Sequence, residues 1–129
     1  MKAEGLMKKA GQAADSGDAD GACNRAYYAV FDAARAALLV TGHDVGKTHK
    51  GVLNAFSDRL VKNGPLPKEM GRLLKYAETF RYVADYEGDP VQLGDAREMV
   101  AKAESFGLAM QAEFMPNASD DDDYPKSRS

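Results

Sequence analysis

Apolar residues recur along this chain at steps of three and four positions, and glycine or proline interrupts the pattern four times. A repeat of about 3.6 residues is typical of an amphipathic α-helix, whereas a half-buried strand repeats every two residues. Each block between interruptions therefore predicts one helix. The expected helices span residues 2–15, 20–40, 47–62, 67–86 and 93–115. We expect an all-α protein built as a helical bundle.

The composition supports the same fold class. The chain has 129 residues, of which 44% are hydrophobic, and this is enough for one domain with a real core. It contains 21 Ala but only 8 Val, 3 Thr and no Ile. The β-branched residues that favour sheets are therefore scarce, and a β-sandwich or doubly wound sheet is excluded.

The negative charge gathers near the C-terminus. The formal net charge is −3, and the run Asp120–Asp123 lies in a polar segment, residues 116–129, that we expect to be a disordered acidic tail. Residues 1–115, the expected bundle, hold 15 basic and 16 acidic side chains. Such a balance argues against a protein that coats nucleic acid with a broad basic surface, and it leaves room for a local anion site.

Targeting and redox signals are weak. No stretch approaches the roughly 20 apolar residues of a membrane span, and residues 1–10 have no signal-peptide core. The single cysteine, Cys23, can form neither an internal disulfide nor a multi-thiolate metal site. We expect a cytoplasmic protein with no membrane association, no metal and no cofactor.

The segment 42–48 ends in Gly-Lys-Thr, like a phosphate-binding P-loop. The full motif fails, because Thr41 stands where its first glycine belongs and no strand precedes it. We interpret it as a helix start with Thr48 as N-cap, where backbone amides and Lys47 favour an anion. His49 lies at this helix start, and it is either a neutral base or a half-buried ring at the edge of an apolar stripe.

Polar residues also line one side of the helix expected at 20–40. Asn24 and Tyr28 share a stripe, and Arg25 lies beside it. Tyr27 and Tyr28 point about 100° apart, so one ring can enter the core while the other presents its hydroxyl in a cleft. Alternatively both rings pack in the core or an interface.

The helix expected at 67–86 carries Glu78, Arg81 and Asp85 at steps of three and four, so two carboxylates can brace the arginine. Tyr82 and Tyr86 follow the same helix one turn apart. A surface ion pair is the ordinary interpretation of this pattern. Arginine donors and tyrosine rings are also the groups that bind RNA phosphates and bases.

Three segments together resemble the HEPN family, the higher eukaryotes and prokaryotes nucleotide-binding domain. The matching segments are 24–31 (NRAYYAVF) with 33–39, 46–52 (GKTHKGV) and 81–86 (RYVADY), and the resemblance covers about residues 1–112. It implies a four- to five-helix antiparallel bundle that forms a homodimer. It also implies a partner protein, a minimal nucleotidyltransferase that acts as the antitoxin in a prokaryotic toxin–antitoxin pair, and binding of nucleotide or RNA.

Catalytic members of that family resemble metal-independent ribonucleases that use an arginine and a histidine four to six residues later. Arg81 matches the arginine, but Asp85 and Tyr86 stand where the histidine is expected. One hypothesis is that His49 supplies the missing base, which gives Arg81, His49, Asp85 and Tyr86 as catalytic candidates. Binding candidates are Lys47, Thr48, Asn24, Arg25, Tyr28 and Tyr82. The other hypothesis is a non-catalytic interaction or dimerisation module.

Overall fold

The computed structural model describes the backbone of residues 2–86 and 92–114, with side chains from 5–80 and 92–114. Its helices are α1 (Lys2–Asp15), α2 (Ala19–Val40), α3 (His49–Ala55), η1 (Phe56–Lys62), α4 (Lys68–Tyr86) and α5 (Leu93–Phe114). The described residues form no strand, which confirms the all-α prediction.

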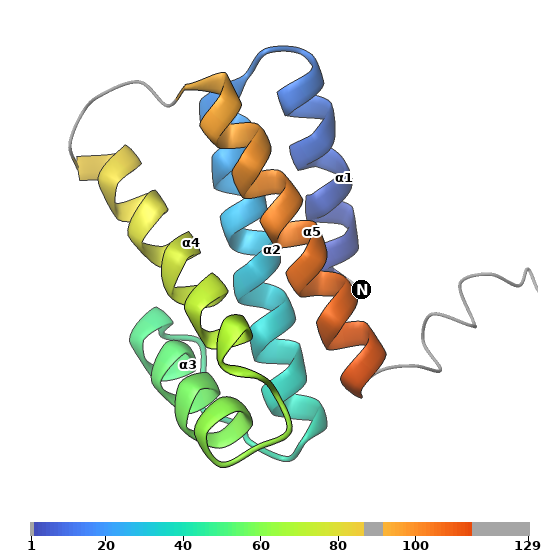
Figure 1. The fold of residues 1–129 in the computed structure, drawn as a ribbon, viewed down its shortest axis with the longest axis vertical. Coiled ribbons are helices and arrows are strands. Elements are labelled where there is room, and N and C mark those ends of the chain that lie inside the picture. Colours follow the sequence, from blue (N-terminus) through green and yellow to red (C-terminus); the bar gives the residue numbers. More distant parts are fainter. Residues whose placement is uncertain (1, 87–91, 115–129) are drawn as a thin grey trace, which may run out of the picture.

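The long helices lie side by side as a bundle (Figure 1). Successive long helices run in opposite directions, so α2 and α5 point the same way. Helix α2 packs most extensively against α1 and α5, and also contacts α4 and α3. α2 is therefore the central helix, and residues on its different sides face every other helix.

Small side chains let α1, α2 and α5 approach closely. One cluster of buried residues consists only of alanines, Ala13 and Ala14 of α1, Ala22 of α2 and Ala96 of α5. Larger side chains fill the other half of the core, where the rings of Phe56 and Phe106 lie 5.5 Å apart. The alanine-rich sequence thus fixes a tight contact at one end, and the aromatic residues fill a wider space at the other.

Capping groups explain where the predicted helices begin and end. Asp18 accepts a hydrogen bond from the Gly21 amide at the start of α2, and Thr48 accepts one from the Gly51 amide at the start of α3. Gly17 and Gly42 adopt positive φ angles of 85° and 88° just beyond α1 and α2. The boundaries of α1, α2, α4 and α5 agree with the predicted ranges to within a residue.

The helix predicted at 47–62 differs from the observed structure. It begins at His49, because Thr48 is the cap, and it changes to a π-helix at Phe56. The wider winding appears in the hydrogen bond from the Asn63 amide to the Asp58 carbonyl, five residues earlier. The sequence pattern predicts Leu53, Phe56 and Leu60 on the buried face. Phe56 and Leu60 are buried as predicted, whereas Val52 is buried and Leu53 is half-buried.

The remaining core predictions are largely confirmed. In α2 and α5 every residue predicted to face the core is buried (Cys23, Tyr27, Val30, Ala34 and Leu38; Ala96, Met99, Ala103, Phe106 and Met110). In α4 the pattern predicts an inward face of Met70, Leu73, Ala77, Phe80 and Ala84. Ala77 is buried, the other predicted residues with described side chains are half-buried, and Leu74 is buried without having been predicted. The side chain of Ala84 lies outside the described residues. The predicted tail, residues 116–129, lies outside the described residues. None of the described helices is long and apolar enough to cross a membrane.

Candidate functional site

Helix α2 places two adjacent tyrosines beside the first residue of α3. Tyr27 is buried, with 1% of its surface exposed, while Tyr28 is half-buried. Their rings meet edge to face, with centroids 5.3 Å apart. The prediction that one ring enters the core is therefore confirmed, and Tyr27 is that ring.

The buried hydroxyl of Tyr27 joins three helices. Its oxygen lies 2.9 Å from Nδ1 of His49 in α3 and 3.2 Å from Oε2 of Glu78 in α4. Buried tyrosine hydroxyls need such partners, because an unpaired polar group inside a protein is costly. The contact with Glu78 spans 51 residues of sequence, and that with His49 spans 22.

Counting protons assigns the tautomer of His49. The Tyr27 phenol has one proton, which it donates to Glu78, since an ionised carboxylate only accepts. The His49 Nδ1 must then carry a proton and donate it to the phenol oxygen. In neutral His49 the lone pair is consequently on Nε2, the nitrogen that can act as a base.

Aromatic rings surround the His49 imidazole. Its centroid lies 4.5 Å from the ring of Phe31, 5.6 Å from Tyr27 and 6.3 Å from Tyr28. The imidazole itself is half-buried, so one side remains accessible. These contacts fix the plane of the ring, and the hydrogen bond to Tyr27 fixes its rotation.

The loop before α3 is tied to α2. Nε of Arg35 donates to the Gly46 carbonyl at 3.0 Å, and the Gly46 amide donates to the Asp44 carboxylate at 3.3 Å. Gly46 has a φ of 80°, a conformation that favours glycine. Together with the Thr48 cap, these contacts set the position at which α3 begins and hence the position of His49.

The second group of predicted residues lies further along α4. Arg81, Tyr82, Asp85 and Tyr86 belong to the helical backbone of α4, but their side chains lie outside the described residues. Arg81 follows Glu78 by three residues, and positions three apart are neighbours on a helix surface. The hydrogen-bonded network of His49, Tyr27 and Glu78 therefore ends at Glu78, three residues before Arg81 on α4.

The other binding candidates are dispersed. Thr48 caps α3, and Lys47 precedes it as an exposed residue. Asn24 is exposed one turn before Tyr28 on α2. Arg25 pairs with Asp18 at 4.0 Å, which gives it a structural partner at the start of α2. The structure thus brings Tyr28 and His49 together, and it leaves Arg25 in another contact.

Sequence reasoning missed the polar roles of Tyr27 and Glu78 in this site. Tyr27 was expected only as a core residue, and Glu78 only as a brace for Arg81. A buried tyrosine hydroxyl needs a partner, which was the available signal, but the sequence spacing does not identify that partner. Among the described residues no group of three or more His, Cys, Asp or Glu could hold a metal ion.

The sequence matches the HEPN domain family over residues 1–111. The chain belongs to the HEPN family. The chain is 34% identical over 116 residues to a protein of Gloeobacter violaceus named UPF0332 protein. The match covers 88% of this chain and 90% of that protein. A UPF0332 protein of Thermotoga maritima is 38% identical over 87 residues, 66% of this chain and 64% of that one.

A further relative of this HEPN chain comes from Methanocaldococcus jannaschii and carries the name "Putative toxin MJ0605". The two are 35% identical over 82 residues, which is 64% of this chain and 60% of the relative. The predicted HEPN resemblance is thus confirmed over almost all of the described bundle.

Proposed function

We propose that this HEPN protein is the toxin of a two-component toxin–antitoxin pair and that it cleaves RNA without a metal. The observation that carries the proposal is the hydrogen-bonded series Glu78–Tyr27–His49. It links His49 through Tyr27 to Glu78, which lies three residues before Arg81 on α4. The name of the Methanocaldococcus relative supports the toxin assignment.

In the proposed reaction Nε2 of His49 accepts the proton of a ribose 2′-hydroxyl. The 2′-oxygen then attacks the adjacent phosphorus, and the bond from phosphorus to the 5′-oxygen breaks. That leaving oxygen takes a proton from water, and the products are a 2′,3′-cyclic phosphate and a 5′-hydroxyl. Arg81 stabilises the charge that develops on the phosphoryl oxygens.

The polar network suits this role because it holds the imidazole in one tautomer. A neighbouring group that fixes the tautomer and orientation of a histidine is a recurring device of acid–base sites. Asp85 and Tyr86, one turn beyond Arg81 on α4, are proposed to orient the arginine and the substrate. Lys47, Thr48, Asn24, Arg25, Tyr28 and Tyr82 are proposed as surrounding contacts to the nucleotide or RNA.

The test is incubation of the purified chain with total RNA in the presence of EDTA, comparing wild type, Arg81→Ala and His49→Ala. The matched control is His43→Ala, which alters the only other histidine of the chain. His43 contacts Arg59 at 3.2 Å, and no contact among the described residues links it to the network. We expect cleavage by the wild type and by His43→Ala and none by the other two variants.

Dimer state is measured on the same samples by sedimentation, since the family resemblance predicts a homodimer. Absence of cleavage by a dimeric, folded wild type would refute the ribonuclease proposal in favour of a non-catalytic interaction module. Growth inhibition on expression, relieved by a co-expressed nucleotidyltransferase, tests the toxin assignment separately.

A further inference from the structure

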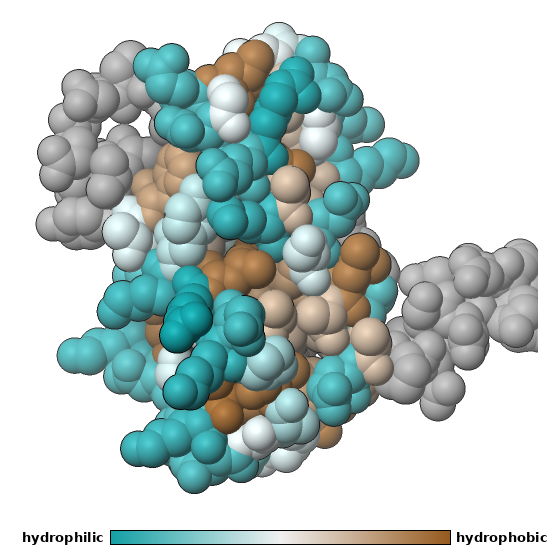
Figure 2. Space-filling view, viewed as in Figure 1, coloured by the Kyte–Doolittle hydropathy of each residue, from teal (hydrophilic) through white to brown (hydrophobic). Residues whose placement is uncertain are grey.

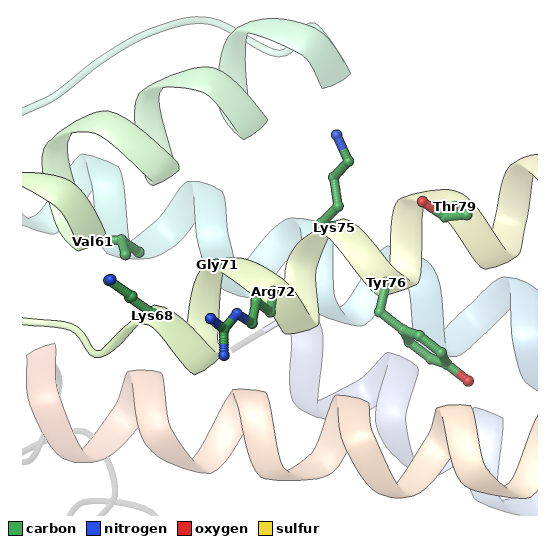
Figure 3. Close-up of a pocket in the computed structure, with 7 residues that line it drawn as sticks. All are labelled: Val61, Lys68, Gly71, Arg72, Lys75, Tyr76 and Thr79. Atoms are coloured by element: carbon green, nitrogen blue, oxygen red, sulfur yellow. The ribbon is translucent and has the colours of Figure 1, made fainter.

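A groove follows the outward side of α4 next to η1 (Figure 3). It is a shallow, open hollow of about 560 Å³. Val61 of η1 lines it from one side, and Gly71 and Tyr76 of α4 line it from the other. In Figure 3 the Tyr76 ring extends from α4 toward the neighbouring helix, which is α5. Figure 2 shows hydrophobic surface between hydrophilic residues beside the lower half of α4.

Three cations line the same groove. Lys68, Arg72 and Lys75 follow one another at steps of four and three, so they share one face of α4. Within the part of the chain that the structure describes, none of them has an ion pair or a side-chain hydrogen bond. The three cations of the groove are therefore not paired with any acidic side chain of the described bundle.

Cations elsewhere on the described surface are paired differently. Arg97 reaches Asp15 at 3.4 Å and the Ala14 carbonyl at 3.0 Å. Lys102 reaches Glu98 at 3.7 Å, and its Nζ also lies 5.2 Å from the centroid of the Tyr76 ring, which lines the groove. A stripe of unpaired cations raises the local concentration of anions, and it favours an anionic ligand over a neutral one.

The floor of the groove is apolar and contains an aromatic ring. Gly71 exposes bare backbone, and a Cβ built there would lie 3.5 Å from a methyl group of Val61. The Tyr76 ring meets Phe80 edge to face, with 5.8 Å between centroids. Burial raises the pKa of the Tyr76 phenol above its ordinary value, as do nearby Glu98 and Asp95. The phenol therefore keeps its proton, and Glu98 and Asp95 are acidic groups that act on the Tyr76 end of the groove.

We propose that this groove binds one nucleotide unit of single-stranded RNA, with its phosphate on Lys68, Arg72 and Lys75 and its base against the floor. The cations require an anion, and the apolar floor with an aromatic ring suits a planar base. The inference rests on the proposed function, since it places RNA on the helix that carries Arg81.

The first test removes charge. In a His49→Ala background, which separates binding from cleavage, a fluorescein-labelled single-stranded hexaribonucleotide is titrated at several salt concentrations. Arg72→Ala with Lys75→Ala is expected to weaken binding about tenfold and to lower the salt slope by up to about 0.7, the contribution of one phosphate contact to a single strand. The control is Lys8→Ala with Lys9→Ala, two exposed cations of α1, which should change neither quantity.

The second test fills the floor without removing charge. Gly71→Ala adds a methyl group at ordinary contact distance from Val61, so the variant should fold and be slightly more stable. Gly11→Ala in α1 is the control, because a Cβ there meets nothing within 4 Å. Both variants should raise Tm, and only Gly71→Ala should weaken binding of the hexaribonucleotide.

Competition distinguishes the sources of phosphate. Uridine monophosphate should displace the labelled RNA at a lower concentration than inorganic phosphate does. Equal competition by the two would refute a role for the base. A polyglutamate peptide that binds as tightly as RNA, and that depends on the same cations, would assign the groove to an acidic protein partner instead.

The outcomes separate this inference from the proposed function. Metal-independent cleavage by the wild type, together with unchanged RNA binding by the groove variants, would overturn the inference and leave the ribonuclease in place. Loss of binding by the groove variants without any cleavage by the wild type would support an RNA-binding groove on a non-catalytic protein. If the His49→Ala variant, with all groove residues intact, does not bind RNA, the groove proposal is overturned.

Discussion

The two sides of α4 differ in whether their charged side chains have partners. On the side that faces α2 and α3, the Glu78 carboxylate is half-buried and accepts a hydrogen bond from Tyr27, which in turn contacts His49. On the outward side, Lys75 and Arg72 line an open groove and have no partner among the described side chains. One helix thus carries a fixed polar network and a stripe of free cations.

The difference shows what burial imposes. A polar group inside a protein must be paired, so the position of Glu78 is set by its partners and its chemistry is predetermined. An exposed cation keeps its hydration and its rotamer freedom until a ligand arrives, so its position is set by that ligand. We therefore expect substitutions on the inner side to change stability and those on the outer side to change binding.

The largest expected effect is that of Tyr27→Ala. The substitution removes a buried ring and both hydrogen bonds, and it should lower the free energy of unfolding by about 3–5 kcal/mol. Urea denaturation measures the loss. Tyr28→Ala, at the half-buried neighbour, is the control and should cost less. Equal losses would show that the inner network adds nothing beyond aromatic packing.

Tyr27→Phe separates the hydroxyl from the ring. It leaves His49 and Glu78 without their shared partner, and it should lower the free energy of unfolding by about 1–2 kcal/mol. The proton distribution on His49 should also change, which ¹⁵N NMR of the imidazole measures. A variant with unchanged imidazole nitrogen shifts would show that Tyr27 does not set the tautomer.

Gly71→Ala changes a residue on the outward side of α4, and it is expected to raise the free energy of unfolding rather than lower it. The glycine lies inside α4, so alanine should raise the free energy of unfolding by about 0.5–1 kcal/mol. Thermal unfolding measures the gain. Gly51→Ala is the contrasting variant, because its Cβ would lie 2.6 Å from the capping oxygen of Thr48. That variant should be less stable than the wild type, and stabilisation by both would contradict the observed cap.

Lys75→Ala should leave stability almost unchanged. No described partner is lost, so the free energy of unfolding should shift by less than about 0.5 kcal/mol. The same sample should show weaker binding of the hexaribonucleotide. A clear loss of stability on urea denaturation would mean that the outward cations hold the fold together, and the contrast between the two sides would fail.

The smallest expected effect concerns pH. Burial and the nearby carboxylates raise the pKa of Tyr76, so the folded chain holds the phenolic proton more tightly than the unfolded chain does. The resulting stabilisation is complete below about pH 10, the ordinary pKa of tyrosine, and is lost as pH rises through the higher folded value. Comparing the stability of wild type and Tyr76→Phe between pH 8 and 11 measures it. A difference independent of pH would contradict the shift.

The helices could be predicted from the sequence because their signals are local. Glycine and proline mark the ends, and residues such as Thr48 provide the cap. The π-winding of η1 was missed, since no local residue pattern separates it from an ordinary turn. In the preceding α3 the pattern also predicted Leu53 rather than Val52 in the core, whereas Phe56 and Leu60 of η1 are buried as predicted.

The candidate site was predicted less completely because its contacts are distant in sequence. His49 was identified, but its link to Tyr27 and Glu78 depends on how three helices pack. The stripe of Lys68, Arg72 and Lys75 was visible as a helical spacing, and such stripes are usually only solvated surface. The groove beside η1, which these cations line, is the feature that suggests a ligand site.

The π-helix also affects how the chain tolerates changes of length. A π-turn uses one residue more than an α-turn, so deleting one exposed residue of η1, such as Ser57, can be absorbed by rewinding as an α-helix. The same deletion within α2 would rotate every later residue by about 100° around the axis and turn the buried face outward. Single-residue deletions should therefore be tolerated in η1 and not in α2.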